Sequence, residues 1–311
     1  MRALCCRAER CYSVASSTVR RPTSPRRSAA TGSCSASLAP LRAGPRSSSV
    51  RRFTITPERI AGGRVVFDRD ESHHLSRVLR LRSGDTVLAA DGTGHEYTVR
   101  LETVGERATG TVLGVATRET ESPVQITLVQ SVPKGDKMES IVRASTELGV
   151  AQVVPVLTAR TVIALEPGRW RDRARRWQRV AKEAAKQCGR AVVPTVNAPR
   201  PLADVLALDE PADLRLCLWE GAMTATGQGG EQARLPGTTL AASLPLTLPP
   251  AARIHLLVGP EGGLSQGEVE NAQARGWTIV GVGPRTLRAE TAGPAIIAVL
   301  QARFGDLGVG G

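Results

Sequence analysis

Between residues 64 and 117, apolar and polar positions mostly alternate, which is typical of strands buried on one face. Residues 91–94 (DGTG) predict a hairpin turn, because glycine adopts the positive φ that a tight turn requires. Leu75, Val78 and Leu79 are spaced for one or two helical turns. Residues 53–117 therefore predict a small β-barrel-like domain. Its strands are expected over 64–67, 86–90, 96–101 and 110–115.

A second pattern starts at residue 124, after a polar linker over 118–123. Short apolar runs alternate with helical periods, which predicts a mostly parallel α/β sheet in a domain over 124–307. Residues 221–250 are rich in Gly, Thr, Ala and Pro without a period, and predict a long flexible insertion. The strands are expected over 124–132, 152–157, 213–219, 253–258 and 277–282, and the helices over 136–148, 169–187, 199–208, 265–275 and 291–304.

Charge sets the first 52 residues apart from the rest. Eleven arginines against one glutamate give this segment +10 of the formal net charge of +12, which leaves +2 for the remaining chain. It also holds eleven serines and no lysine. This composition predicts an organelle transit peptide over 1–52, for a chloroplast or a mitochondrion. The alternative is a disordered basic arm that binds nucleic acid directly.

Composition excludes several classes of protein. A chain of 311 residues with 41% hydrophobic residues is neither a disulfide mini-protein nor globally disordered. No uncharged apolar run reaches about 18 residues, so no membrane-spanning helix is expected. Beyond residue 52 the cysteines are Cys188 and Cys217, without a C-x-x-C pair or a histidine at metal-ligand spacing. We therefore expect neither a disulfide framework nor a metal site.

One glycine-rich turn follows the apolar run at 253–258. It has the sequence GPEGG (259–263) and leads into a helix that starts with the capping pair Ser265 and Glu268. In open α/β sheets, ligands bind beyond the carboxyl ends of strands, where small residues let the backbone approach closely. The turn matches neither the dinucleotide nor the P-loop motif. The alternative is a tight strand–helix turn that binds nothing.

A second glycine-rich turn follows the next apolar run, with Gly283, Pro284 and two arginines, Arg285 and Arg288, before a helix start. These guanidinium groups suit a phosphate or a developing oxyanion. The alternative is a helix start with surface salt bridges. Because two such turns follow consecutive strands, one composite pocket is the better interpretation.

Basic residues gather in two other places. Lys134 and Lys137 flank a Gly turn at a strand end, which suits a clamp on a nucleic-acid backbone. The helix predicted over 169–187 carries Arg176 and Arg179, and the stretch AKEAAKQCGR (181–190) ends at Arg190. The alternative interpretation of these charges is a solvated surface.

These segments together resemble the ribosomal RNA small subunit methyltransferase E family. The resemblance spans about residues 64–307. It rests on VLRLRSGD (78–85), KGDKME (134–139), ELGV (147–150), AKEAAKQCGR (181–190), LLVGPEGGLS (256–265) and VGVGPRTLRAETA (280–292). Two departures are a longer 221–250 segment and the pair Gly293-Pro294 inside the final predicted helix.

The resemblance implies a PUA-like barrel followed by a SPOUT domain, an α/β trefoil knot whose last helix threads a loop to form the S-adenosylmethionine pocket. It also implies a homodimer that methylates N3 of a uridine in the decoding region of 16S-type small-subunit rRNA, without a metal.

The resemblance also assigns residues. Arg288 is expected to stabilise the uridine anion, and Glu290 or Glu261 to accept its proton. Contacts with RNA are expected from Arg77, Arg80, Lys134, Lys137, Arg176, Arg179 and Arg190. Cofactor contacts are expected from Leu218, Glu220, Val258, Gly259, Pro260, Gly262, Gly263, Val282, Gly283 and Leu287.

Two other functions fit the residues less well. One is a knotted methyltransferase that acts on tRNA. The other is an RNA-binding assembly factor with an inactive pocket, against which the intact glycine-rich turns and Arg288 argue.

Overall fold

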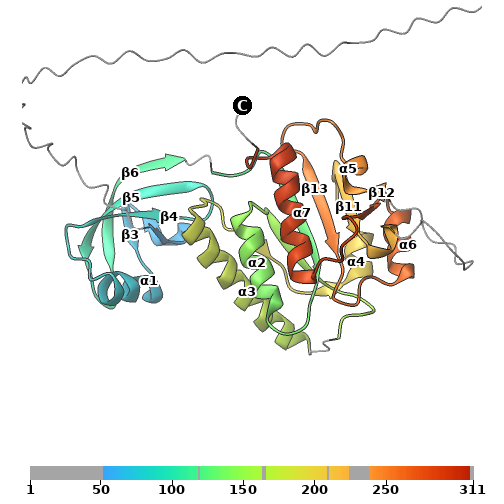
Figure 1. Cartoon of the computed structure of the whole chain (residues 1–311). Helices are drawn as coiled ribbons and strands as arrows, with labels where there is room; N and C mark the ends of the chain where they lie inside the picture. The colour runs from blue at the N-terminus through green and yellow to red at the C-terminus, as the bar shows by residue number, and fades with distance from the viewer. Residues whose placement is uncertain (1–51, 118–119, 163–165, 209, 224–237, 309–311) are drawn as a thin grey trace, which may run out of the picture. The chain divides into compact units, whose positions relative to one another are not determined.

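The computed structural model describes residues 52–117, 120–162, 166–208, 210–223 and 238–308 (Figure 1). The predicted transit peptide, apart from Arg52, lies outside the described residues. So do 118–119 of the predicted linker and 224–237 of the predicted insertion.

The first domain contains one six-stranded sheet in the order β1-β4-β5-β6-β3-β2. All of its pairings are antiparallel except β1 with β4. Its inner face buries Phe53, Val65, Phe67 and Val99 among other apolar side chains. The strands are β1 (Arg52–Thr54), β2 (Ile60–Ala61), β3 (Arg64–Val66), β4 (Thr86–Ala90), β5 (His95–Thr103) and β6 (Thr109–Thr117), with a 3-10 turn η1 (Pro57–Arg59).

Strand β1 starts one residue earlier than the predicted domain boundary. Arg52, which the sequence assigns to the leader, pairs with Leu88 of β4 and forms an ion pair with Glu96 at 2.8 Å. Phe53 is fully buried in the core of the sheet. Arg52 is therefore part of the folded domain.

The helical turns predicted around Leu75 begin earlier, in α1 (Arg69–His73), and continue as one π-helical turn, η2 (His74–Val78). Asp68 caps α1, because its carboxylate accepts a hydrogen bond from the Glu71 backbone N–H at 2.7 Å. The apolar spacing alone did not reveal this start.

The second domain is built on an all-parallel sheet in the order β10-β8-β7-β13-β11-β14-β12, with β9 also paired to β8. Its five longer strands coincide with the five predicted apolar runs. They are β7 (Gln125–Ser131), β8 (Gln152–Leu157), β11 (Leu214–Leu218), β13 (Arg253–Val258) and β14 (Thr278–Gly281). The short strands β9 (Thr195–Val196), β10 (Arg200–Pro201) and β12 (Thr238–Thr239) were not predicted.

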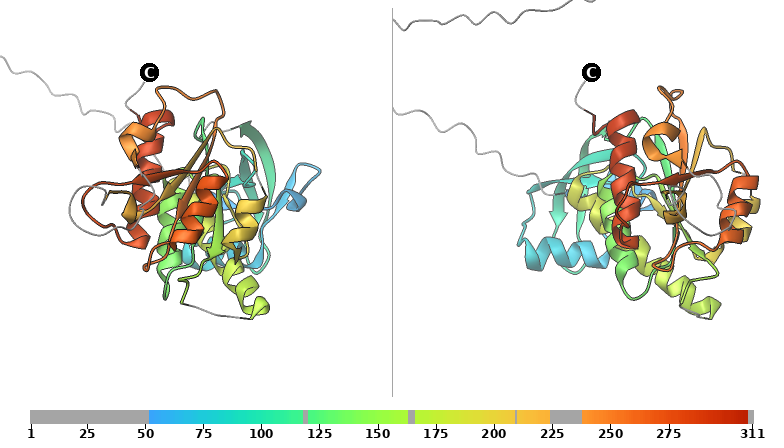
Figure 2. Two further views of the ribbon diagram at one scale, coloured as in Figure 1. Left: turned by 90° about the vertical axis from the view of Figure 1, so that its right-hand side faces the viewer. Right: turned by 45° about the vertical axis from the view of Figure 1, so that its right-hand side comes forward.

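Helices cover both faces of this sheet (Figure 2). On one face α2, α3 and α7 pack on alternate residues of the strands, such as Leu128 and Leu256. On the other face α4 and α6 pack on the intervening residues, such as Val129 and Leu257. The helices are α2 (Lys137–Glu147), α3 (Pro167–Cys188), α4 (Leu202–Ala207), α6 (Gln266–Ala274) and α7 (Ala289–Phe304).

Helix α7 runs without interruption through Gly293 and Pro294. A Cβ at Gly293 would lie 3.3 Å from Gln130 Oε1 and 3.4 Å from Leu128 Cδ1. The absence of a side chain thus lets the helix approach β7 closely.

The segment 221–250 is not wholly irregular, which corrects the prediction for 238–243. After the 3-10 turn η3 (Glu220–Met223), β12 pairs with β14, and α5 (Leu240–Ser243) follows with Thr239 as its N-cap. The trefoil knot stays a prediction, because strand order and pairing do not specify it. Among the described residues, no helix is both long enough and apolar enough to cross a membrane.

Candidate active site

A cleft of about 610 Å³ lies beyond the carboxyl ends of β13, β11 and β14, which are neighbours in the sheet. Leu218, Val258 and Val282 lie at or just after these strand ends and form part of its lining. Ligands of open α/β sheets bind at this edge. The cleft volume is within the roughly 300–1,000 Å³ range of small-molecule sites. It therefore has the position and the size of a ligand-binding site.

The GPEGG turn forms one wall of the cleft. The Gly263 N–H donates to the Pro260 carbonyl at 2.9 Å, which closes the turn. Gly263 has φ +71°, and a Cβ there would lie 3.2 Å from Glu220 Oε1. Both the backbone conformation and the space next to Glu220 favour glycine at this position.

The second glycine-rich turn also lines the cleft. Gly283 has φ +103°, and a Cβ there would meet no atom within 4 Å. Arg285 and Arg288 also line the cleft, and the Arg288 side chain is 82% exposed. Its Nη1 lies 3.8 Å from Glu290 Oε1, at the outer limit of an ion pair. The Arg288 guanidinium is therefore accessible to a ligand.

Lys137, at the first turn of α2, connects the GPEGG turn to the first turn of α7. Its Nζ lies 2.9 Å from Glu261 Oε1 and 3.3 Å from Glu290 Oε2. The Lys134 backbone N–H also donates to Glu261 Oε1, at 3.1 Å. Three segments distant in sequence are thus held together at the cleft.

These contacts shift the pKa of all three groups. Burial by itself raises the pKa of Glu261, but hydrogen bonds from Lys137 and from backbone N–H groups outweigh it, so the net pKa is lowered. The pKa of Glu290 is lowered, first by a hydrogen bond from its own backbone N–H and then by Lys137. The hydrogen bond with Glu261 is the main cause that raises the pKa of Lys137. At neutral pH both glutamates are therefore ionised and Lys137 is charged.

Comparison with known proteins places the chain in a family. The family model for the RNA methyltransferase domain matches residues 120–301, and that for the RNA methyltransferase PUA domain matches residues 67–108. Ribosomal RNA small subunit methyltransferase E of Synechocystis sp. is 34% identical over 81% of this chain and 77% of its own length. The Bacillus subtilis protein of the same name is 30% identical over 72% of this chain and 84% of its own.

The chain belongs to the ribosomal RNA small subunit methyltransferase E family. The crystal structure of the Neisseria gonorrhoeae member bound to S-adenosylmethionine is 32% identical, covers 83% of this chain and 99% of its own, and has a TM-score of 0.69. A Legionella pneumophila protein in complex with S-adenosylmethionine is 28% identical over the same shares, with a TM-score of 0.71. The predicted fold class, a PUA-like domain before a methyltransferase domain, is confirmed.

The structure brings nearly all of the predicted cofactor and catalytic residues of this family member to the cleft. Two do not line it. Gly262 faces away, since a Cβ there would lie 3.5 Å from the Arg160 side chain, which corrects its placement in the pocket. Glu290 contacts Lys137 and Arg288 but is not one of the residues that line the cleft. The predicted residues that line the cleft are Leu218, Glu220, Val258, Gly259, Pro260, Glu261, Gly263, Val282, Gly283, Leu287 and Arg288.

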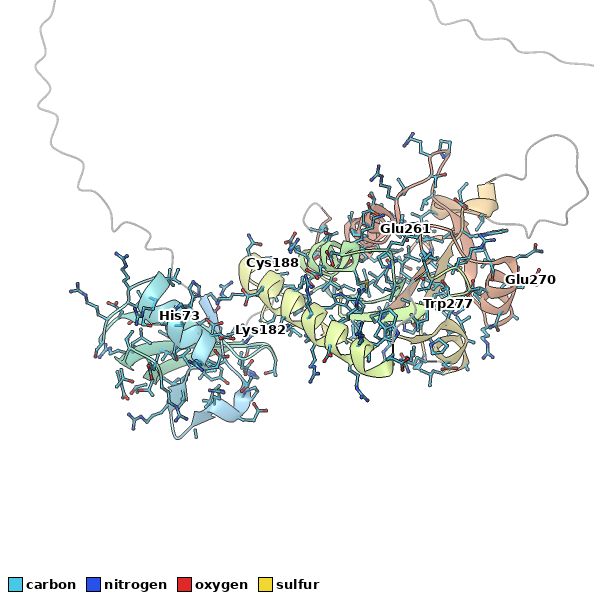
Figure 3. All side chains as sticks on the ribbon, turned by 90° about the horizontal axis from the view of Figure 1, so that it is seen from below. His73, Lys182, Cys188, Glu261, Glu270 and Trp277 are labelled. Atoms are coloured by element: carbon cyan, nitrogen blue, oxygen red, sulfur yellow. The ribbon has the colours of Figure 1, made fainter. Side chains whose placement is uncertain are left out.

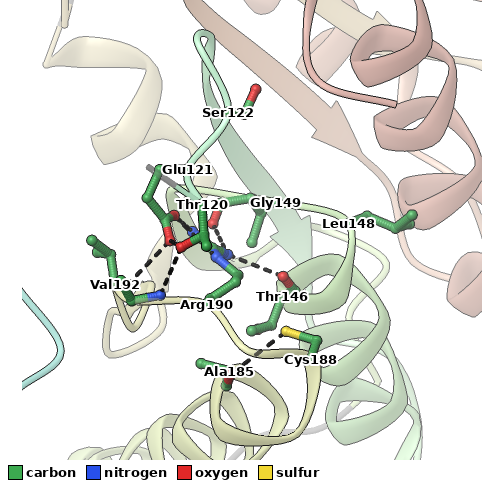
Figure 4. Close-up of polar contacts among 12 residues, drawn as sticks. Thr120, Glu121, Ser122, Thr146, Leu148, Gly149, Ala185, Cys188, Arg190 and Val192 are labelled. Carbon is green, nitrogen blue, oxygen red and sulfur yellow. Dashed lines mark hydrogen bonds and ion pairs between the residues drawn. The ribbon is translucent and has the colours of Figure 1, made fainter. Parts of the chain in front are cut away.

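Arg190 is a structural residue, which corrects the prediction of an RNA contact. The residue is only 8% exposed. Its Nη1 donates to the carbonyls of Thr146 at 3.0 Å and Val150 at 2.8 Å, and its Nε donates to Glu121 at 3.1 Å (Figure 4). This guanidinium links the start of the second domain to α2 and to the end of α3. Because these contacts hold it inside the protein, it is not available to bind RNA.

The other predicted RNA contacts lie at the surface. Arg77, Arg80, Lys134 and Arg179 are exposed. Arg176 is 58% exposed and forms an ion pair with Glu139 at 2.6 Å, whereas Lys137 is directed into the cleft. Other charges of α3 contact residues of the first domain: Lys182, which is labelled in Figure 3, lies 3.7 Å from Asp68, and Lys186 lies 2.8 Å from Glu71.

Two cleft features lacked a clear sequence signal. Trp219 lines the cleft beside Leu218 and Glu220, and only its adjacency to these predicted residues pointed to it. Arg160, in the loop after β8, contacts the GPEGG turn and belongs to no recognised motif. Within the described ranges, no group of three or more His, Cys, Asp or Glu side chains is arranged to hold a metal ion.

Proposed function

We propose that this protein transfers a methyl group from S-adenosylmethionine to N3 of a uridine in the decoding region of a 16S-type small-subunit rRNA. One observation carries the proposal: both glycine-rich turns and Arg288 line a single cleft at the ends of three neighbouring parallel strands. The family relatives named for small-subunit rRNA methylation and the relatives with bound S-adenosylmethionine support it.

The cleft residues suit S-adenosylmethionine. Leu218, Val258 and Leu287 offer apolar contact to an adenosine group, and Gly263 and Gly283 leave backbone within reach of it. The Glu220 carboxylate is exposed at the same cleft, where it would attract the positively charged part of the molecule.

S-Adenosylmethionine, when bound, supplies an electrophilic methyl group. N3 of the uridine would form a bond to the methyl carbon as the bond from that carbon to the sulfonium sulfur breaks, which releases S-adenosylhomocysteine. The proton on N3 must leave for this to occur, and the negative charge that N3 then carries is shared with the neighbouring carbonyl oxygens. Arg288 cannot accept the proton, because its guanidinium stays charged, but it donates hydrogen bonds that stabilise this charge.

Glu261 and Glu290 are the two candidate proton acceptors. Both are ionised at neutral pH, as an acceptor must be, although a lowered pKa also makes each a weaker base. Glu261 lines the cleft but its carboxylate is held by Lys134 and Lys137. Glu290 lies next to Arg288. Glu261→Gln and Glu290→Gln separate the two, since the acceptor's variant loses the rise of the methylation rate that occurs as the pH increases through the lowered pKa of that glutamate.

RNA binding is proposed for the exposed arginines and Lys134. Because the chain beyond residue 52 carries only +2, affinity depends on few phosphate contacts. Arg179→Glu is expected to weaken rRNA binding. It is also expected to flatten the plot of the logarithm of the binding constant against the logarithm of the salt concentration, by roughly 0.7–0.9 in slope for one lost phosphate contact. Arg303→Glu, an exposed charge change at the end of α7, is the control. An unchanged affinity and slope for Arg179→Glu would assign α3 to the solvated surface.

We also propose import into a chloroplast or a mitochondrion through the residues that precede Arg52, and assembly as a homodimer. The arginine- and serine-rich composition supports import. N-terminal sequencing of the mature protein tests it, and a mature chain that begins at Met1 would contradict it. Light scattering measures the mass of the assembly.

The decisive experiment supplies the full chain with S-adenosylmethionine and either small subunits or tRNA from cells that lack the enzyme. Nucleoside analysis is expected to detect N3-methyluridine in small-subunit rRNA, with Arg288→Ala as the negative control. Methylation of tRNA alone would favour the tRNA enzyme. Absence of S-adenosylmethionine binding in calorimetry would favour the assembly factor.

A further inference from the structure

Arg160 contacts the GPEGG turn from outside the cleft. It lies in the loop that follows β8, and its Nη1 donates to the Gly262 carbonyl at 2.7 Å. Its side-chain stem lies beside the same residue, because a Cβ at Gly262 would be 3.5 Å from both Cβ and Cδ of Arg160. The two residues are 102 positions apart in sequence.

The loop that carries Arg160 is itself held on both sides. The Thr158 N–H donates to Thr161 Oγ1 at 2.9 Å, and the Ser131 hydroxyl lies 3.0 Å and 3.2 Å from the hydroxyls of these threonines. Ser131 is fully buried at the end of β7. The Ala159 N–H donates to Glu268 Oε1 at 2.8 Å, and Glu268 also belongs to the capping box of α6. Arg160 therefore lies in a loop that hydrogen bonds attach to β7 and to α6.

The contact with Arg160 bears directly on the cleft wall. The carbonyl of Gly262 and the N–H of Gly263 belong to one peptide unit, so a fixed carbonyl also fixes the direction of that N–H. Gly263 lines the cleft, and a Cβ there would lie 3.9 Å from Arg160 Nη1. On the other side, Glu261 is held by Lys134 and Lys137. The turn is thus held from both sides by charged groups.

We propose that Arg160 is a positioning residue that holds the Gly262–Gly263 peptide in the orientation required for cofactor binding. The proposal rests on the proposed function, in which this cleft binds S-adenosylmethionine. It assigns Arg160 no contact with the reacting atoms. A single donor is sufficient for this role, so lysine is expected to replace arginine here in large part.

Two substitutions separate the hydrogen bond from the packing of the stem. Arg160→Met keeps an apolar stem and loses every donor, whereas Arg160→Lys keeps a charged donor. We expect Arg160→Met to weaken S-adenosylmethionine binding about tenfold, as for one charge-assisted hydrogen bond at a partly exposed site. Arg160→Lys should remain within about threefold of wild type by the same reasoning. Arg303→Met is the matched control, because Arg303 is exposed and donates to a single carbonyl, that of Leu246, at 3.2 Å.

Calorimetry measures the affinities, and thermal unfolding should show that all three variants remain folded, with a Tm within a few degrees of wild type. Amide hydrogen exchange without ligand provides a second readout: the Gly263 N–H should exchange faster in Arg160→Met than in wild type. Wild-type affinity together with wild-type Gly263 exchange in Arg160→Met would overturn the role of Arg160. A wild-type protein that fails to bind S-adenosylmethionine would instead overturn the proposed function, and the exchange rates would still decide whether Arg160 holds the turn.

Discussion

The ammonium nitrogen of Lys137 lies 2.9 Å from Oε1 of Glu261, although 124 residues separate the two in sequence. The same nitrogen lies 3.3 Å from Oε2 of Glu290. The RNA contact predicted for Lys137 stays a prediction; in the structure Lys137 links the GPEGG turn to the first turn of α7.

The pH dependence of cofactor affinity tests this network. The pKa of Glu261 and that of Glu290 are lowered from 4.5, and the pKa of Lys137 is raised from 10.5. The ion pairs are therefore complete near neutral pH, and they are lost as the pH falls through the lowered glutamate pKa values or rises through the raised lysine pKa. We expect a flat S-adenosylmethionine affinity between about pH 5 and 9 and an acidic decrease below the ordinary glutamate pKa.

The variant Lys137→Met moves this acidic decrease. Without the ammonium, the pKa of each glutamate returns toward its ordinary value, so the decrease begins at a higher pH than in wild type. Affinity at neutral pH should also fall, by about threefold, since partly exposed ion pairs contribute little. Calorimetry between pH 4 and 9 checks both expectations. Coincident acidic decreases in the two proteins would contradict the coupling.

The paired variants Gly263→Ala and Gly262→Ala test the geometry of the GPEGG turn. Alanine at Gly263 must adopt φ +71°, which costs about 1–2 kcal/mol, and its Cβ would approach Glu220 Oε1 to 3.2 Å. S-Adenosylmethionine affinity is expected to fall at least about tenfold. Gly262→Ala should bind normally, because its Cβ meets Arg160 at an ordinary 3.5 Å. Equal losses in both variants would contradict the assignment of the cleft-facing glycine.

Periodicity and turn chemistry were enough to predict the main architecture of the second domain. Each long strand lies in one continuous apolar run. Consecutive residues such as Leu256 and Leu257 face opposite helix layers, so the runs are apolar throughout. The cleft was predictable because GPEGG and the second turn follow parallel strands, β13 and β14, that lie on either side of β11 and so end at the same edge of the sheet. The two-residue strands lacked enough sequence to form a pattern.

Long-range pairing of charges was not predictable from sequence. Arg190 stands in a basic segment that looks like a solvated surface, yet carbonyls of Thr146 and Val150 bind it inside the fold. Arg160 stands in a loop without a motif and acts through Gly262, far away in the chain. Local sequence gives the charge of such residues but not their partners.

Arg190→Met is expected to lower stability without changing the affinity of the folded protein for RNA. The change removes the Arg190 donors to Glu121 and to two carbonyls. The Arg190 side chain is 8% exposed and that of Glu121 is 29% exposed, so the loss is expected to cost about 1–3 kcal/mol. Arg190→Lys should rescue little, because one ammonium cannot replace the planar fork. Urea denaturation measures the free energy of unfolding. A normal free energy of unfolding combined with weaker RNA binding would restore Arg190 to the RNA surface.

Arg288→Ala tests the proposed transition-state contact. Arg288 is 82% exposed and its only ion pair, among the described residues, spans 3.8 Å to Glu290, so its removal should leave the free energy of unfolding unchanged. Removing one donor to a developing negative charge typically lowers the rate by about 10²–10³. The rate should fall on this scale while S-adenosylmethionine affinity changes much less, since the contact is used mainly in the transition state. Arg288→Lys should recover little activity, because an ammonium lacks the planar fork.

Arg285→Ala is the matched control for Arg288, because Arg285 is exposed on the same turn and lines the same cleft. Single-turnover methylation of small subunits isolates the chemical step from product release. A near-normal rate for Arg288→Ala together with a large loss for Arg285→Ala would transfer the charge-stabilising role to Arg285. Near-normal rates for both would leave that role to backbone N–H groups of the two turns, which no side-chain substitution removes.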